Sequence, residues 1–430
     1  MKETTTTELP IERAILVAAP TKDLSPAAVT EHLEELARLA DTAGAQVVST
    51  LQQRLDSPNP KLYIGEGKAA ELKALIEQTS TTLVIFDDEL SPAQSKNLEE
   101  TLKTRVMDRA ELILDIFATR ARTAEAQMQV ELAQLEYMLP RLKRMWTHLT
   151  RGGGIGFRGP GETQLETDRR MIGRRISELR RKLEIVEQRR ATQRKSRAEE
   201  FRTALVGYTN AGKSSLLRSL SGADVFVEDR LFATLDPATR SVELEPGARV
   251  LVTDTVGFIR KLPHNLVASF RATLEEVTEA HLLVHVVDGA DENWFEHTQV
   301  VEEVLAELGV AEKPQLRVFN KVDQLTHGEE ESLRARARAV ADSPVVLSST
   351  VEPGGLDELR SALLAELRKQ RPELRITLSA EDGETLASIY RDGEVLQRED
   401  VDSRVLLVAR LPAAAVGRLR ARAGVRVDAE

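Results

Sequence analysis

The chain has 430 residues, of which 41% are hydrophobic and 30% charged, so it is long enough for two to four folded domains. No apolar run approaches the ~18 residues of a membrane-spanning helix. The opening MKETTTTELP also lacks the apolar segment of a secretory signal. The absence of cysteine excludes disulfides, thiolate metal sites and cysteine nucleophiles. We therefore expect a cytoplasmic protein that spans no membrane.

Charge is distributed unevenly along the chain. The formal net charge is −10, yet residues 141–197 contain 17 lysines and arginines against 6 acids, a local balance of +11. The rest of the protein is therefore strongly acidic. One concentrated basic segment in an acidic protein indicates a localised contact with a polyanion.

Residues 1–107 alternate strand-like runs with helical patterns. The runs lie at 14–18, 46–49 and 83–86, and the helical patterns at 26–42, 67–78 and 92–103. This alternation predicts a small α/β domain with a parallel sheet.

Residues 108–198 are predicted to form an antiparallel helical hairpin. Apolar residues recur at spacings of three and four from Phe117 to Leu142, which predicts one helix of about 30 residues. A second long helix carries the same spacing from Leu165 to Val186. Two such helices joined by a glycine-rich tip loop, 150–162, are expected to fold back on each other.

Residues 199–371 again alternate apolar strands with helices, and each strand ends in polar residues. This pattern predicts a doubly wound α/β domain with ligand loops at the carboxyl ends of its strands. Residues 372–430 indicate a small α+β domain. The predicted fold class is thus multidomain α/β, in which a hairpin follows the N-terminal domain.

Two glycine-rich stretches compete as the nucleotide site. GIGFRG (154–159) matches G-x-G-x-x-G, but it follows a helical pattern and no strand precedes it, so a dinucleotide interpretation fails in context. GYTNAGKS (207–214) lies between the strand TALV and the helix SLLRSL. Its backbone N–H groups are expected to wrap phosphates at the start of that helix. We therefore predict a phosphate-binding loop at 207–214.

The phosphate side of the site follows from this loop and two later motifs. Lys213 is expected to reach the β- and γ-phosphates, and the Ser214 hydroxyl to ligate Mg²⁺. Thr234 is the predicted second hydroxyl on Mg²⁺, Asp254 a carboxylate behind the metal, and the Gly257 N–H a sensor of the γ-phosphate. Lys213, Thr234 and Gly257 are the candidate catalytic residues. The predicted phosphate-side contacts are Gly207, Tyr208, Thr209, Asn210, Ala211, Gly212, Lys213, Ser214, Ser215, Phe232, Thr234, Asp254, Thr255 and Gly257.

The base is read by NKVD (320–323), which follows the strand LRVF. The Asp323 carboxylate can accept from guanine N1–H and the N2 amine, whereas adenine would leave a buried charge unpaired. Lys321 is expected to lie along the base, and Asn320 to tie neighbouring loops together. The backbone of Ser348, Ser349 and Thr350 is expected to donate to guanine O6. The predicted nucleotide is GTP.

Phe258 follows DTVG, at the position where many small GTPases carry a glutamine that orients the attacking water. A phenylalanine has no group for that task. We expect slow hydrolysis by the isolated protein, accelerated either by a group that a partner supplies or by a rearrangement of the site on docking.

The basic segment is a candidate RNA-binding surface. Residues 169–197 hold 12 basic side chains against three acids. A solvated helix face is the ordinary explanation of such a run, but it should carry comparable glutamate. Arginine also suits phosphate contacts and base stacking. The candidate RNA contacts are Arg151, Gly153, Phe157, Arg158, Arg169, Arg170, Arg174, Arg175 and Arg181.

The block GGGIGFRGPGETQLETDRR (152–170), followed by GYTNAGKSSL, FATLDPATR and DTVGFI, resembles the HflX family of ribosome-associated GTPases. The stretches YIGEGK (63–68), DDELSPAQ (87–94) and 116–142 agree, so the resemblance covers nearly the whole chain. The nucleotide motifs of the family align with this sequence without a gap. One difference is SST at 348–350, where many GTPases have Ser-Ala-Lys.

The resemblance implies binding to the large ribosomal subunit, with the hairpin loop directed toward the peptidyl-transferase centre. It also implies that the GTP form splits stalled or idle ribosomes, notably under heat stress. Some members of the family hydrolyse ATP through the N-terminal region, but YIGEGK is not a Walker motif.

Two alternatives remain open. The protein could be a biogenesis factor for the large subunit, or a GTP-switched module that docks on another protein. We expect a monomer, and association with ribosomes or membranes would place part of it in a peripheral fraction.

Overall fold

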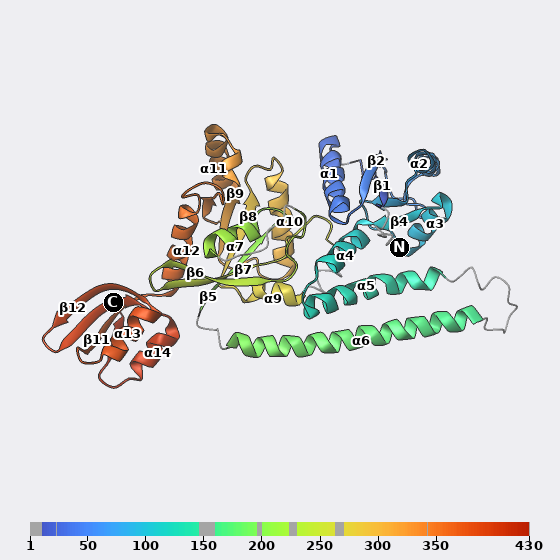
Figure 1. Cartoon of the computed structure of the whole chain (residues 1–430). Helices are drawn as coiled ribbons and strands as arrows, with labels where there is room; N and C mark the ends of the chain where they lie inside the picture. Colours follow the sequence, from blue (N-terminus) through green and yellow to red (C-terminus); the bar gives the residue numbers. More distant parts are fainter. Residues whose placement is uncertain are drawn as a thin grey trace, which may run out of the picture. The chain divides into compact units, whose positions relative to one another are not determined.

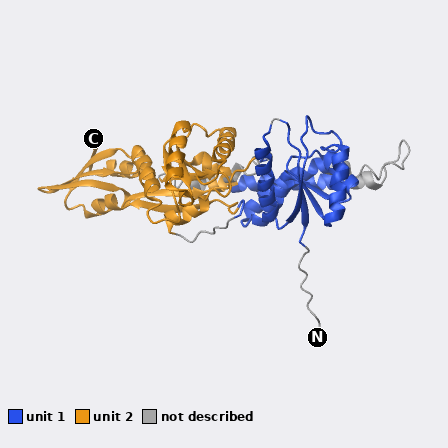
Figure 2. Ribbon diagram, turned by 90° about the horizontal axis from the view of Figure 1, so that it is seen from above, with its two compact units in different colours: residues 1–186, 230–232, 261–270 blue, residues 187–229, 233–260, 271–430 orange. Residues whose placement is uncertain are grey.

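The computed structural model describes residues 11–22, 24–145, 160–195, 200–222, 230–262, 271–341 and 343–429. They form two compact units, coloured separately in Figure 2. Unit 1 comprises residues 1–186 together with 230–232 and 261–270, and unit 2 comprises 187–229, 233–260 and 271–430. None of the helices in the described part of the chain combines the length and apolar character that a membrane crossing requires.

Unit 1 contains a four-stranded parallel sheet with the order β2-β1-β3-β4 (Figure 1). The predicted parallel α/β fold is therefore confirmed, and β4 is an edge strand that the sequence analysis missed. Central strand β3 is buried along its whole length, which explains its continuous apolar run LVIF. The elements are β1 (Arg13–Ala18), α1 (Pro26–Thr42), β2 (Gln46–Gln52), α2 (Glu66–Thr79), β3 (Leu83–Phe86), α3 (Pro92–Leu102), β4 (Arg105–Asp108), α4 (Arg109–Arg120) and α5 (Ala124–Met145).

The prediction of one 30-residue helix after Asp108 is wrong, because the segment forms α4 and α5. The Asp108 carboxylate caps α4 by accepting the Glu111 N–H at 2.9 Å. Helix α4 ends where Ala121 adopts an extended conformation, and the Thr123 hydroxyl then accepts the Ala126 N–H at 3.1 Å, near the start of α5. Helix α5 continues through Pro140, in agreement with the apolar repeat that extends to Leu142. Because α4 packs on the sheet and on α1, the N-terminal fold extends beyond the predicted boundary at 107.

Helix α6 (Pro160–Lys195) lies alongside α5 (Ala124–Met145) and runs in the opposite direction, as expected for an antiparallel hairpin (Figure 1). The two helices bury a small apolar cluster centred on Leu132, Ile176 and Leu179. Ion pairs flank this cluster: Arg175 binds Glu131 through two hydrogen bonds of 2.7 and 2.8 Å, and Arg180 binds Glu136 at 2.7 Å. The repeat of apolar residues seen in the sequence is therefore the contact surface of the hairpin.

Unit 2 contains the doubly wound sheet, with the order β10-β9-β8-β5-β7-β6. All neighbouring pairs are parallel except β6 with β7. The elements are β5 (Phe201–Gly207), α7 (Lys213–Ser221), β6 (Ala238–Glu245), β7 (Ala248–Asp254), α9 (Arg271–Glu279), β8 (Leu282–Asp288), α10 (Trp294–Glu307), β9 (Gln315–Asn320), the 3₁₀ helix η1 (Val322–Gln324), α11 (His327–Val340), β10 (Val345–Leu347) and α12 (Asp357–Gln370).

The C-terminal part of unit 2 is an antiparallel sheet with the order β12-β13-β11-β14, which agrees with the predicted α+β domain. Its strands bury an apolar core against α13 and α14. The elements are β11 (Glu373–Ser379), α13 (Gly383–Asp392), β12 (Glu394–Val401), β13 (Arg404–Arg410), α14 (Ala413–Arg420) and β14 (Arg426–Ala429).

Candidate functional site

The loop 207–214 joins the end of β5 to the start of α7, and two of its glycines are required by close approach. Gly207 (φ +154°) would place a Cβ 2.1 Å from the Val286 carbonyl oxygen. Gly212 (φ +94°) would place one 2.2 Å from Asn320 Nδ2. Only glycine tolerates this backbone and these contacts, so the loop can lie directly against its neighbours at the N-terminus of α7.

Lys213 is buried at the base of this loop. Its ammonium donates to the carbonyl oxygens of Gly207 at 3.1 Å and Tyr208 at 2.8 Å. Burial lowers the pKa of Lys213 to about 8, while the nearby Asp254 carboxylate acts in the opposite direction. A desolvated cation at the N-terminus of a helix is suited to an anionic phosphate chain.

Three oxygen-bearing side chains meet next to Lys213. Ser214 Oγ donates to Asp254 Oδ2 at 2.6 Å and lies 2.8 Å from Thr234 Oγ1. Asp254 is fully buried, and its Oδ1 atom has no hydrogen-bond partner among the described residues. Burial raises the pKa of Asp254, opposed by Lys213 and by the hydrogen bonds to the carboxylate. A buried carboxylate with an unsatisfied oxygen beside two hydroxyls fits Mg²⁺, which prefers oxygen ligands.

The backbone after β7 lies against the phosphate loop. A Cβ on Gly257 would lie 2.7 Å from Thr209 Cα and 3.1 Å from Lys213 Nζ, so this position also requires glycine. The Gly257 backbone is therefore next to the lysine that we expect at the γ-phosphate. Thr255, by contrast, is buried and donates its hydroxyl to the Leu205 carbonyl at 2.6 Å, a structural role.

The predicted guanine-binding residues lie at the same edge of the sheet. Asn320 Nδ2 donates to the Ala211 carbonyl at 3.0 Å and so connects the base loop to the phosphate loop. The Ser349 hydroxyl donates to Asp323 Oδ1 at 2.6 Å. Lys321 has a left-handed backbone (φ +63°) and pairs with Asp288 at 2.7 Å. Asp288, at the end of β8, was missed by the sequence analysis, although the polar ending of LLVHVVD was a signal for it.

Two of the three backbone donors expected at guanine O6 are already engaged. The Ser348 N–H donates to the Phe319 carbonyl at 2.8 Å, and the Ser349 N–H to the Gly355 carbonyl at 3.0 Å. Thr350 is therefore the better candidate of the three for a backbone contact with the base.

Several predicted contacts lie elsewhere. Phe232 belongs to unit 1, where its buried ring packs edge-to-face on Phe117 with ring centroids 4.7 Å apart. Arg175 is held by Glu131, whereas Arg169, Arg170, Arg174 and Arg181 are exposed on α6. Arg151, Gly153, Phe157 and Arg158 lie outside the described residues.

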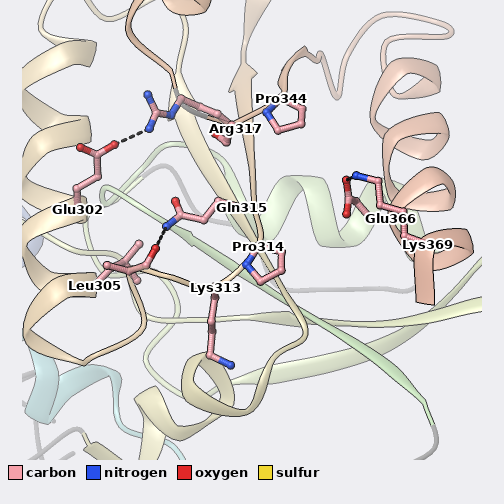
Figure 3. Close-up of a pocket in the computed structure, with 11 residues that line it drawn as sticks. Glu302, Leu305, Lys313, Pro314, Gln315, Arg317, Pro344, Glu366 and Lys369 are labelled. Carbon is pink, nitrogen blue, oxygen red and sulfur yellow. Dashed lines mark hydrogen bonds and ion pairs between the residues drawn. The ribbon is translucent and has the colours of Figure 1, made fainter.

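A separate cavity of about 560 Å³ lies by the start of β9 and β10, the edge opposite the nucleotide loops (Figure 3). Its cations have partners. Arg317 binds Glu302 at 2.5 Å, Lys369 binds Glu366 at 2.6 Å, and Lys313 donates to the Ala280 carbonyl at 2.8 Å. The cavity thus lies at the end of the strands away from the predicted nucleotide loops, and it has no phosphate-binding loop in its lining.

The glycine loop, the buried lysine, the hydroxyl–carboxylate cluster and the Asn-Lys-x-Asp loop together define a P-loop GTPase. Three family descriptions match the chain: GTP-binding GTPase N-terminal at residues 30–118, GTP-binding GTPase Middle Region at 120–197, and 50S ribosome-binding GTPase at 202–321.

Similar curated proteins include the GTPase HflX of Magnetococcus marinus, 44% identical over 97% of each chain. The GTPase HflX of Escherichia coli is 43% identical over 89% of this chain and 90% of its own. A solved GTP-binding protein from Sulfolobus solfataricus in complex with GDP is 26% identical over 83% of this chain and 100% of that chain, with a TM-score of 0.44. Because its sequence is this similar to HflX proteins over most of their length, this chain belongs to the HflX family of GTPases.

Proposed function

We propose that this protein binds the large ribosomal subunit and, in its GTP state, dissociates idle or stalled ribosomes into subunits. The observation that carries this proposal is the row of exposed arginines on α6, namely Arg169, Arg170, Arg174 and Arg181, in a chain that also holds a GTPase site. Exposed arginines match a phosphate backbone. Membership of the HflX family and the match to a family described as 50S ribosome-binding GTPase support ribosomal RNA as that partner.

Mg²⁺ is part of the proposed active form. Ser214 and Thr234 would ligate the ion, and Asp254, with its unsatisfied Oδ1, would hold it from behind. When bound, Mg²⁺ supplies neutralisation of the charge on the β- and γ-phosphates. Lys213 would add positive charge there, and the N–H of Gly257, whose backbone lies close to Lys213, would donate to the γ-phosphate.

Turnover by the protein alone is proposed to be slow, with stimulation by the ribosome. Phe258 is fully buried, and its hydrocarbon side chain has no group that could orient water. The hydrolytic site therefore lacks the side chain that positions water in many GTPases. We propose that the protein acts as a cytoplasmic monomer, with heat stress as a condition of use.

The test is a sucrose-gradient profile of 70S ribosomes incubated with the protein and either a non-hydrolysable GTP analogue or GDP. We expect free subunits with the analogue only, and the protein in the large-subunit fraction. A 70S peak that survives in both cases, with the protein co-sedimenting, would indicate a ribosome-bound GTPase of another purpose. Accumulation on precursor particles alone would favour the biogenesis alternative.

Matched variants locate the RNA contact. Changing Arg169, Arg170, Arg174 and Arg181 to Gln should weaken ribosome binding and flatten its salt dependence, since fewer phosphates are contacted. The control changes four exposed arginines of the C-terminal domain, Arg375, Arg404, Arg420 and Arg426, in the same way. Equal losses in both variants would argue for a non-specific charge effect, and unchanged binding by the α6 variant would reject the proposed surface.

Deleting residues 152–161, of which 152–159 lie outside the described residues, should spare GTP binding but impair splitting. Intact splitting by that variant would reject a role for the hairpin loop.

A further inference from the structure

Tyr208, the second residue of the phosphate loop, carries a side chain that phosphate binding does not require, because such loops act through backbone N–H groups. The side chain is nevertheless almost fully buried, at 7% exposure. Its ring stacks on the imidazole of His297 from α10, with centroids 3.9 Å apart and planes 15° from parallel. The neighbouring helix α10 therefore holds the aromatic ring in one place.

The Tyr208 hydroxyl reaches the segment that follows Gly257. It accepts a hydrogen bond from the Arg260 N–H at 3.0 Å. Two backbone bonds join the same segment to the loop, from the Thr209 N–H to the Phe258 carbonyl at 2.7 Å and from the Phe258 N–H to the Gly207 carbonyl at 3.0 Å. Of these three attachments, the phenol is the one that a side-chain substitution can remove.

The Tyr208 backbone contacts the other half of the catalytic site. Its carbonyl oxygen accepts from the Lys213 ammonium at 2.8 Å. One residue thus contacts the phosphate-binding lysine through its main chain and the Gly257–Arg260 segment through its side chain. With Phe258 buried and unable to orient water, the geometry of catalysis depends on the backbone of this segment. Small displacements of such groups cost substantial rate.

We propose that Tyr208, held by His297, is a positioning residue for GTP hydrolysis, which fixes Gly257–Arg260 against the phosphate loop so that the Gly257 N–H and Lys213 act on the γ-phosphate together. This role concerns hydrolysis by the chain itself and does not depend on the ribosome.

The variant Tyr208→Phe tests the role, because it removes the hydroxyl and keeps the stacked ring. In single-turnover hydrolysis by the full-length protein with Mg²⁺, we expect the rate at saturating GTP to fall about 3- to 10-fold, the effect of losing one hydrogen bond. The dissociation constants for GTP and GDP and the melting temperature should remain those of the unchanged protein. The matched control is Tyr390→Phe, at an exposed tyrosine in the C-terminal domain, which should hydrolyse GTP normally.

His297 variants test the support of the ring. His297→Ala should lower the hydrolysis rate as Tyr208→Phe does, whereas His297→Phe, which restores a stacking partner, should recover most of it. The double variant His297→Ala/Tyr208→Phe should lose little more than either single variant, because both act on one contact.

Three results would overturn the proposal. One is an unchanged or faster rate in Tyr208→Phe. Another is a parallel loss of GTP affinity, GDP affinity and melting temperature, which would make the residue a structural element of the loop only. The third is failure of His297→Phe to recover activity that His297→Ala loses.

Discussion

The two units each contain a sheet of mainly parallel strands with acidic residues at the carboxyl ends of those strands, and the two sheets differ in how these acids are bonded within the described residues. In unit 1, Asp87 follows β3 and binds Arg109 at 2.8 Å and Lys261 at 2.7 Å. Asp108 ends β4 and accepts from the Tyr137 hydroxyl at 2.7 Å and from Arg141 at 3.0 Å. These carboxylates are occupied by the protein's own donors.

In unit 2, Asp254 ends β7 in an equivalent topological position, but one of its oxygens lacks a partner among the described residues. Glycines bring the backbone of the loop to within contact distance, and Lys213 is held by carbonyl oxygens instead of carboxylates. The carboxyl edge of a parallel sheet is therefore a place where a site can form, and unsatisfied polar groups decide whether one does.

The largest effect is expected for a variant that tests whether the nucleotide binds at the carboxyl ends of the strands in the sheet of unit 2. Lys213→Ala should weaken binding of GTP about 1,000-fold or more, roughly 4 kcal/mol, because the phosphates lose a desolvated cation. Titration with a fluorescent GTP analogue measures this, with Lys61→Ala, at an exposed lysine of unit 1, as control. Tight GTP binding by Lys213→Ala would show the phosphate-loop assignment to be wrong.

The second prediction concerns the occupied edge of unit 1. Arg109 is buried and pairs with Glu35 and Asp87, so Arg109→Leu should cost about 3–5 kcal/mol of unfolding free energy by leaving buried carboxylates without this partner. GTP affinity should be retained. Calorimetric unfolding of the full chain measures the loss. The surface pair of Arg334 with Glu358 is the control, where Arg334→Leu should cost less than about 1 kcal/mol. Similar costs for the two variants would contradict this description of unit 1.

The smallest effect is a pH dependence in unit 1. Burial raises the pKa of Glu111 to about 7, Asp108 adds to this, and Arg105 opposes it. Because the pKa of Glu111 in the folded protein lies above its ordinary value of 4.5, the ionised carboxylate destabilises the fold above pH 7, and this cost falls as the pH drops from 7 toward 4.5. Glu111→Gln should therefore stabilise the protein at pH 8 by on the order of 1 kcal/mol and much less at pH 5.

Melting temperatures at the two pH values check this, with Glu384→Gln, at an exposed glutamate, as control. If the melting temperatures of Glu111→Gln and of the unchanged protein differ by the same amount at both pH values, the carboxyl of Glu111 does not titrate as described.

The sequence by itself determined the parts of this protein that depend on local backbone chemistry. The glycines at 207 and 212 and the lysine at 213 occur at fixed spacing between a strand and a helix, and a phosphate loop needs only that local arrangement. The same holds for the apolar repeat of α5 and α6, whose period predicted their contact. The break at Ala121 was missed because helix periodicity continues across it in the sequence.

Tertiary structure alone decided which partners the other side chains of the predicted nucleotide and RNA motifs contact. Phe232 lies in a nucleotide motif but packs on Phe117, and Arg175 lies in a basic run but pairs with Glu131. Tyr208 reaches Arg260, 52 residues away, only because the end of β5 and the segment after β7 lie side by side. Such contacts join residues far apart in the chain, and no local pattern records them, because their geometry depends on how the strands and helices pack.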